Sequence, residues 1–212
     1  LNMRGNLFDS ALMKTSAIDA GFRARYFSNA QEAFEGRVTV FDGPEDFHAR
    51  IDDPALGLTD DSVLVMRGAG PKGYPGGAEV VNMRPPSYLI KQGVRALPCI
   101  GDGRQSGTSG SASILNASPE AADGGGLALL QDGDPIRIDL KQRRVDVLLD
   151  ETELAARRAA LDAAGGYAQP ESQSPWQEIF REKVRPFSEG MVFEGATEYR
   201  DIPSRGLPRN NH

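Results

Sequence analysis

Residues 136–149 read IRIDLKQRRVDVLL, and this stretch decides the fold class of the chain. Apolar and polar residues alternate over 136–140, which is the pattern of a strand with one buried face. A second β-branched run follows at 144–149. The polar residues between the two runs form a short connection of the kind found in hairpins. The stretch therefore predicts two adjacent antiparallel strands.

Similar short apolar runs recur along the chain, separated by Gly and Pro residues. The segments predicted to be strands are 38–41, 62–67, 94–100, 126–130, 136–140 and 144–149. The segments predicted to be helices are 44–51, 85–92, 151–164 and 175–184. In the last helix, Trp176, Ile179 and Phe180 share one face. Many short strands with scattered helices indicate an α/β, β-rich fold that resembles a barrel and not a doubly wound sheet.

The composition excludes several classes of protein. The chain has 212 residues and a formal net charge of −6, which argues against a nucleic-acid partner. No apolar run reaches the roughly 18 residues of a membrane helix, so no membrane partner is expected. Cys99 is the single cysteine, which permits no internal disulfide and favours a cytoplasmic protein. Together with His48 and His212 it cannot form a self-contained zinc or four-cysteine iron–sulfur site.

Two glycine-rich loops each follow a predicted strand. The first is 68–83, GAGPKGYPGGAEVVNM, and the second is 101–126, GDGRQSGTSGSASILNASPEAADGGG. If the two strands are neighbours and end at the same edge, their loops would build one pocket. The glycine spacing of the second loop matches neither a dinucleotide-binding loop nor a P-loop. An anion-binding turn and a tight structural turn both stay open for it.

Ser106, Thr108 and Glu79 are the candidate site residues of these loops. Ser106 and Thr108 carry hydroxyls that could act as nucleophile or base, but a Ser–His–Asp triad would have to recruit His48 or His212. A serine without an imidazole can lose its proton beside a bound divalent cation, which prefers oxygen ligands. Glu79 is then either such a ligand or a solvated surface residue.

Other polar residues are interpreted as structural. Asp102 and Arg104 could form an ion pair that fixes the second loop, and a substrate contact is the alternative for them. Glu120 follows a Ser-Pro pair and is expected to stabilise the first turn of a helix. Arg157 and Arg158 are expected on a solvated helix face.

The blocks PKGYPGGAEVVNM, GRQSGTSGS, NASPEAADGGG and ELAARRA occur in an order and spacing that resemble the dihydroxy-acid and sugar-acid dehydratase family, which includes 6-phosphogluconate dehydratase. The resemblance runs from about Gly5 onward and covers the family's C-terminal part. It implies a swivelling β-barrel-like domain flanked by helices, expected here at 1–186, and a C-terminal arm at 187–212. The larger N-terminal domain, which binds the cluster in the family, is expected to be absent from this chain.

The resemblance also implies the roles of the site residues. Glu79 would be the single Mg²⁺ ligand that this domain contributes. Ser106 would be the base that removes the C2 proton of the substrate, and Thr108 would be a hydroxyl close to the reacting atoms. The family's N-terminal domain supplies the other Mg²⁺ ligands and the cysteines of a [2Fe–2S] cluster, and Cys99 matches none of them.

Residues within and after these blocks indicate which subgroup of the family the chain resembles. Asn116 stands where family members of amino-acid synthesis carry a histidine, and the ending RGLPRNNH resembles aldonic-acid members such as arabinonate and xylonate dehydratases. We therefore expect part of a homo-oligomeric hydro-lyase that converts a sugar acid into a 2-keto-3-deoxy acid, with the isolated chain inactive. The alternatives are a dihydroxy-acid dehydratase of branched-chain amino-acid synthesis, a catalytically inert binding domain of the same fold, and a serine hydrolase.

Overall fold

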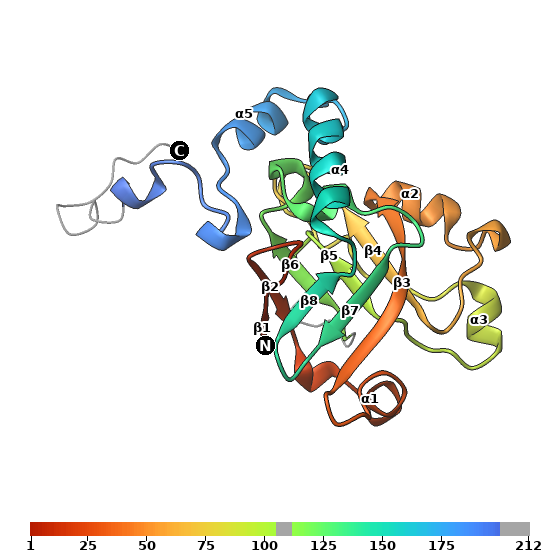
Figure 1. Cartoon of the computed structure of the whole chain (residues 1–212). Helices are drawn as coiled ribbons and strands as arrows, with labels where there is room; N and C mark the ends of the chain where they lie inside the picture. The colour runs from red at the N-terminus through yellow and green to blue at the C-terminus, as the bar shows by residue number, and fades with distance from the viewer. Residues whose placement is uncertain (105–111, 200–212) are drawn as a thin grey trace, which may run out of the picture.

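The computed structural model describes residues 1–104 and 112–199. Within these residues one mixed sheet of eight strands has the order β1-β2-β6-β5-β4-β3-β7-β8 (Figure 1). Its strands are β1 (Asn2–Met3), β2 (Ser10–Met13), β3 (Ala33–Asp42), β4 (Ser62–Arg67), β5 (Cys99–Gly101), β6 (Ile114–Ser118), β7 (Pro135–Asp139) and β8 (Arg144–Val147). The helices are α1 (Ala20–Tyr26), α2 (Gly43–Arg50), α3 (Ser87–Lys91), α4 (Glu151–Ala163) and α5 (Pro175–Lys183).

The sheet curls until its two edges nearly meet. Strands β3, β4, β5 and β6 are parallel neighbours, and antiparallel strands flank them on both sides. At the edges, the Arg4 N–H donates to the Arg143 carbonyl at 3.0 Å and the Val145 N–H donates to the Arg4 carbonyl at 2.8 Å. These bonds bring the first and last strands together, so the α/β, β-rich, barrel-like fold predicted from the sequence is confirmed.

The central strand β4 explains why the sheet has two apolar faces. Its sequence SVLVMR is apolar without alternation, as expected of a parallel strand that is covered on both sides. Val63 and Val65 belong to a cluster to which all eight strands contribute, which is the interior of the barrel. Leu64 and Met66 belong to a second cluster that includes Phe47 of α2 and residues of α3. The helices therefore cover the outer face of this strand.

Most of the predicted elements are present. The hairpin is β7–β8, with Ile136 opposite Val147, and Cys99 is buried at 3 % exposure as an apolar residue. The four predicted helices are α2, α3, α4 and α5. The predicted strand at 126–130 is wrong. Its residues form a 3₁₀ helix, η4 (Gly126–Leu129), because carbonyl groups there accept hydrogen bonds from Arg67 and do not pair with a strand.

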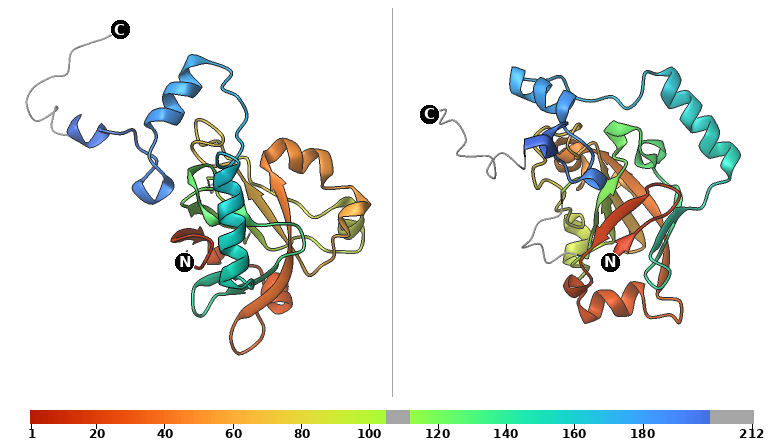
Figure 2. Two further views of the ribbon diagram at one scale, coloured as in Figure 1. Left: turned by 45° about the horizontal axis from the view of Figure 1, so that its top comes forward. Right: turned by 90° about the vertical axis from the view of Figure 1, so that its left-hand side faces the viewer.

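The segment after α4 runs outside the barrel and contacts one of its edges (Figure 2). It contains α5 and the 3₁₀ helices η5 (Phe187–Glu189) and η6 (Ala196–Tyr199). The apolar face predicted for α5 is open only in part. Trp176 is 78 % exposed and Ile179 is 46 % exposed, whereas Phe180 packs against Phe193. No helix of the described residues is long and apolar enough to cross a membrane. The proposed boundary between a domain at 1–186 and an arm at 187–212 stays a prediction.

Closure of the barrel predicts that Gly5→Ala strongly lowers the stability of the fold. A Cβ at Gly5 would lie 1.6 Å from the Val145 carbonyl oxygen, so any side chain pushes the two sheet edges apart. We expect Gly5→Ala to lower the free energy of unfolding by at least about 2 kcal/mol in urea denaturation. Gly21→Ala in α1 is the control, because its Cβ would lie 3.2 Å from a single side-chain atom. Equal stability of the two variants would contradict the closure.

Candidate functional site

The parallel strands deliver four connections to one edge of the barrel. Because β3, β4, β5 and β6 run in the same direction, the residues that follow each of them meet at their carboxyl ends. The loop after β4 carries Glu79, the loop after β5 carries Asp102 and Arg104, and Glu120 follows β6. The two glycine-rich loops therefore leave neighbouring strands at the same end, as predicted from the sequence.

The Asp102 carboxylate ties three of these connections together. It is fully buried and accepts hydrogen bonds from the backbone N–H groups of Gly68 at 3.0 Å, Ala69 at 2.9 Å and Ala121 at 2.9 Å. Burial raises the pKa of Asp102, and the backbone donors oppose that shift by stabilising the anion. The predicted Asp102–Arg104 ion pair is wrong, because Asp102 turns inward to these backbone groups.

Arg104 instead bridges to the other glycine-rich loop. Its guanidinium lies 2.8 Å from Oε1 of Glu79, and its Nε donates to the Gly77 carbonyl at 2.8 Å. The side chains are 44 % exposed for Arg104 and 33 % for Glu79. The first two loops are thus joined at their outer ends by an ion pair and at their roots by Asp102.

Glu79 faces an open pocket of about 440 Å³. Its other lining residues come from α2 and the first loop, and they are Pro44, Glu45, His48, Tyr74, Val80 and Asn82. Among the described residues, no group of three or more His, Cys, Asp or Glu side chains could hold a metal ion. The partly exposed Glu79 carboxylate fits the role of one oxygen ligand. A cation bound to Glu79 would need further ligands from outside the described residues.

Glu120 has a different structural role from the one predicted. It is 2 % exposed, accepts the Phe187 N–H at 2.7 Å and lies 3.1 Å from the Ser118 hydroxyl. Its side chain makes no capping bond to the 3₁₀ helix η3 (Ala121–Asp123) that follows it. The expected first-turn stabilisation is therefore wrong, because the carboxylate turns to the C-terminal segment. Burial raises the pKa of Glu120.

The C-terminal segment also contacts the loop that carries Glu79. Nε of Arg181 donates to the Lys72 carbonyl at 2.9 Å, and the Lys72 ammonium pairs with Asp123. The sulfur of Met191 would lie 2.6 Å from a Cβ at Gly77, so Met191 packs directly against the turn before Glu79. The segment therefore lies across the first loop and the turn after β6.

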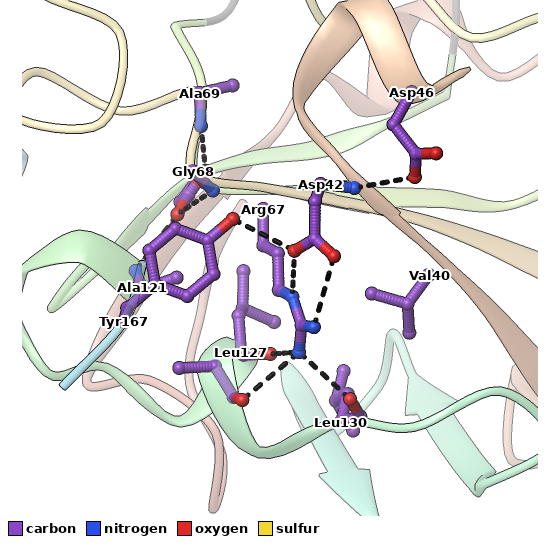
Figure 3. Close-up of polar contacts among 12 residues, drawn as sticks. Val40, Asp42, Asp46, Arg67, Gly68, Ala69, Ala121, Leu127, Leu130 and Tyr167 are labelled. Carbon is purple, nitrogen blue, oxygen red and sulfur yellow. Dashed lines mark hydrogen bonds and ion pairs between the residues drawn. The ribbon is translucent and has the colours of Figure 1, made fainter. Parts of the chain in front are cut away.

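A second cluster beside this site, formed by Arg67, Asp42 and Tyr167, was missed in the sequence (Figure 3). Nε of Arg67 lies 2.6 Å from Oδ1 of Asp42, and the Tyr167 hydroxyl donates to the same oxygen at 2.9 Å. Burial favours the neutral acid, but the Arg67 guanidinium lowers the pKa of Asp42 overall. Burial and the adjacent carboxylate raise the pKa of Tyr167. The sequence feature that could have indicated this cluster is Arg67, an arginine at the end of an otherwise apolar strand.

The interpretation of Arg157 as solvated is also wrong. Its guanidinium lies 2.5 Å from the Asp134 carboxylate, and the two side chains are 13 % and 7 % exposed. It also donates to the Leu129 carbonyl at 3.0 Å. This ion pair holds α4 against the connection between η4 and β7.

Residues 1–191 match the family model described as dihydroxy-acid/6-phosphogluconate dehydratase C-terminal. The chain belongs to this family. It is 53 % identical over 214 residues to D-xylonate dehydratase of Caulobacter vibrioides, an alignment that covers all of this chain and 35 % of that protein. It is 42 % identical to 6-deoxy-6-sulfo-D-gluconate dehydratase of Pseudomonas putida and 39 % identical to L-arabinonate dehydratase of Rhizobium leguminosarum. Each of those two alignments covers 74 % of this chain and 26 % of the relative.

Family membership confirms the resemblance seen in the sequence, but it leaves the roles of individual residues untested. The chain spans only about a quarter to a third of the length of these dehydratases. Ser106 and Thr108 fall in 105–111 and His212 in 200–212, all outside the described residues. The serine base, the neighbouring threonine hydroxyl and the metal-binding role of Glu79 stay predictions.

The buried position of Asp102 predicts that Asp102→Ala strongly lowers the stability of the fold. The variant leaves three backbone N–H groups without their acceptor, and each buried unsatisfied group costs about 1–3 kcal/mol. We expect a loss of at least about 3 kcal/mol in the free energy of unfolding, measured by chemical denaturation. The control is Asp53→Ala, which removes one exposed bond to Ala55 and should cost at most about 1 kcal/mol. A loss below 1 kcal/mol for Asp102→Ala would contradict its role.

Proposed function

We propose that this chain is the C-terminal part of a hydro-lyase that converts an aldonic acid into a 2-keto-3-deoxy acid and water. The observation that carries the proposal is the 53 % identity to D-xylonate dehydratase over the whole chain. Two further relatives are named for dehydration of L-arabinonate and of a sulfo-gluconate. The enzyme is proposed to be a cytoplasmic homo-oligomer in which an N-terminal domain completes the site.

In this proposal Ser106 is the base at C2 of the substrate. Its position in the sequence supports this role, because it follows Arg104 by two residues and Arg104 contacts Glu79. Glu79 would provide one carboxylate oxygen to Mg²⁺, and Thr108 would be a hydroxyl close to the reacting atoms. When bound, Mg²⁺ and a [2Fe–2S] cluster supply Lewis acidity at the substrate oxygens. A neutral serine hydroxyl is too weak a base for this step, so Ser106 would act as the alkoxide, which the nearby positive charge stabilises.

In this proposal the chain carries out one of the two proton transfers of the reaction. Ser106 takes the C2 proton, the C3 hydroxyl leaves as water, and the enol that results becomes the 2-keto acid. The group that protonates the departing hydroxyl is proposed to lie in the N-terminal domain. The isolated chain is therefore expected to be inactive.

A full-length protein with Ser106→Ala tests this function. We expect the parent enzyme to form 2-keto acids from a panel of pentonates and hexonates, and the variant to lose at least about 10³-fold in kcat. Ser28→Ala, an exposed serine after α1, should retain parental activity.

Near-parental turnover by Ser106→Ala would refute the serine base. Product formed only from a branched-chain 2,3-dihydroxy acid would instead favour a dihydroxy-acid dehydratase. Absence of any 2-keto product from either class, with the metal and cluster present, would favour the inert binding domain.

A further inference from the structure

The ion pair between Arg104 and Glu79 occupies the carboxylate that the proposed function gives to a cation. One nitrogen of the Arg104 guanidinium lies 2.8 Å from Oε1 of Glu79, and a second holds the Gly77 carbonyl at 2.8 Å. Both side chains are partly exposed, at 44 % and 33 %. A divalent cation at Glu79 would therefore compete directly with a guanidinium.

We infer that Arg104 is a substrate-binding residue, which Glu79 holds in the absence of a cation and which binds the substrate carboxylate once a cation has taken Glu79. The inference rests on the proposed function. It adds a residue for the anionic end of the sugar acid, separate from the base and from the metal ligand.

The energetics allow this exchange of partners. Partly exposed ion pairs contribute little to stability, because water and salt screen them, so a divalent cation can displace the guanidinium from Glu79. The bond from Nε to Gly77 uses a backbone carbonyl and does not depend on Glu79. It keeps the released guanidinium next to the same loop.

Arg104 is not among the described lining residues of the pocket, but its guanidinium lies 2.8 Å from Glu79, which is one of them. The described lining of the pocket contains the carboxylates of Glu45 and Glu79 and no Lys or Arg side chain. A sugar-acid carboxylate would meet repulsion there unless a positive group offsets it. The planar fork of a guanidinium matches a carboxylate with two parallel hydrogen bonds, which a lysine cannot reproduce.

The test measures metal binding and substrate binding separately in the full-length protein. Mn²⁺ binding is followed by electron paramagnetic resonance without substrate, and KM and kcat are measured with the preferred aldonic acid. The variants are Arg104→Gln, Arg104→Lys and Glu79→Gln. Arg84→Gln is the matched control, because Arg84 directly follows the loop of Glu79. It pairs with Asp52 at 2.6 Å, and the two side chains are 46 % and 48 % exposed. Thermal unfolding shows whether each variant is folded.

Arg104→Gln should bind Mn²⁺ about two- to fivefold more tightly, because the competing charge is gone. It should raise KM at least about tenfold with a smaller change in kcat, because a charged hydrogen bond to the substrate is lost. Arg104→Lys should keep the parental Mn²⁺ affinity and show an intermediate KM. Arg84→Gln should change neither quantity.

Unchanged Mn²⁺ affinity in Arg104→Gln would overturn the competition, and unchanged KM would overturn the substrate contact. Glu79→Gln distinguishes these failures from failure of the proposed function. If Glu79→Gln weakens Mn²⁺ binding while Arg104→Gln changes nothing, only the role of Arg104 is refuted. If Glu79→Gln leaves Mn²⁺ binding unchanged, the metal-ligand role of Glu79 itself is refuted.

Discussion

The buried carboxylate of Asp102 is the constraint on which the candidate site depends. An isolated charge in the interior of a protein is costly, and here three backbone N–H groups offset that cost. These donors belong to residues after β4 and after β6, whereas Asp102 itself follows β5. One side chain thereby fixes the starting points of three connections. The loop from 68 to 86, which contains no helix or strand, depends most on this anchor.

The structure also changes the interpretation of the glycines in the second glycine-rich loop. From the sequence, the glycines of GDGRQSG permit either an anion-binding turn or a tight structural turn. A Cβ at Gly103 would lie 2.3 Å from Cγ1 of Val81 and 3.2 Å from the Cβ of Ala69, so Gly103 permits one loop to pack on the other. Close packing of the loops places Arg104 within reach of Glu79. In this position a glycine therefore shapes the site through contacts between loops.

The sequence predicted the elements that carry strong local signals. The β7–β8 hairpin alternates in polarity, β4 is a continuous apolar run, and α4 consists of strong helix formers. The short strands β1, β2 and β6 were missed, because two to five residues give too little periodicity and their pairing is set by distant partners. The segment 126–130 has a β-like composition, yet the Arg67 guanidinium binds its carbonyl groups. A contact between segments about 60 residues apart leaves no local pattern.

The chemical roles of the site residues stay predictions, and the geometry around them was predicted only in part. The resemblance to the dehydratase family singled out Glu79, and the structure brings its loop beside the loop of Arg104. The partners of Asp102 and Glu120 were predicted wrongly for one physical reason. Sequence neighbours suggested local partners, whereas both carboxylates are buried and turn to backbone N–H groups that are distant in sequence. A buried acid finds donors wherever the fold leaves them, and that arrangement is a property of tertiary structure.

The distribution of acids at this edge is consistent with the proposal that the chain contributes only one ligand to a metal site. Asp102 binds backbone N–H groups, Glu120 binds the C-terminal segment, Asp42 pairs with the arginine at the end of β4, and Asp123 pairs with a lysine. Each of these carboxylates holds the fold together, and releasing it for a cation would loosen the loops. Glu79 instead lines the open pocket together with Glu45, and its partner Arg104 comes from the neighbouring loop. A domain that uses its other acids to position one carboxylate is suited to complete a site whose remaining ligands come from elsewhere.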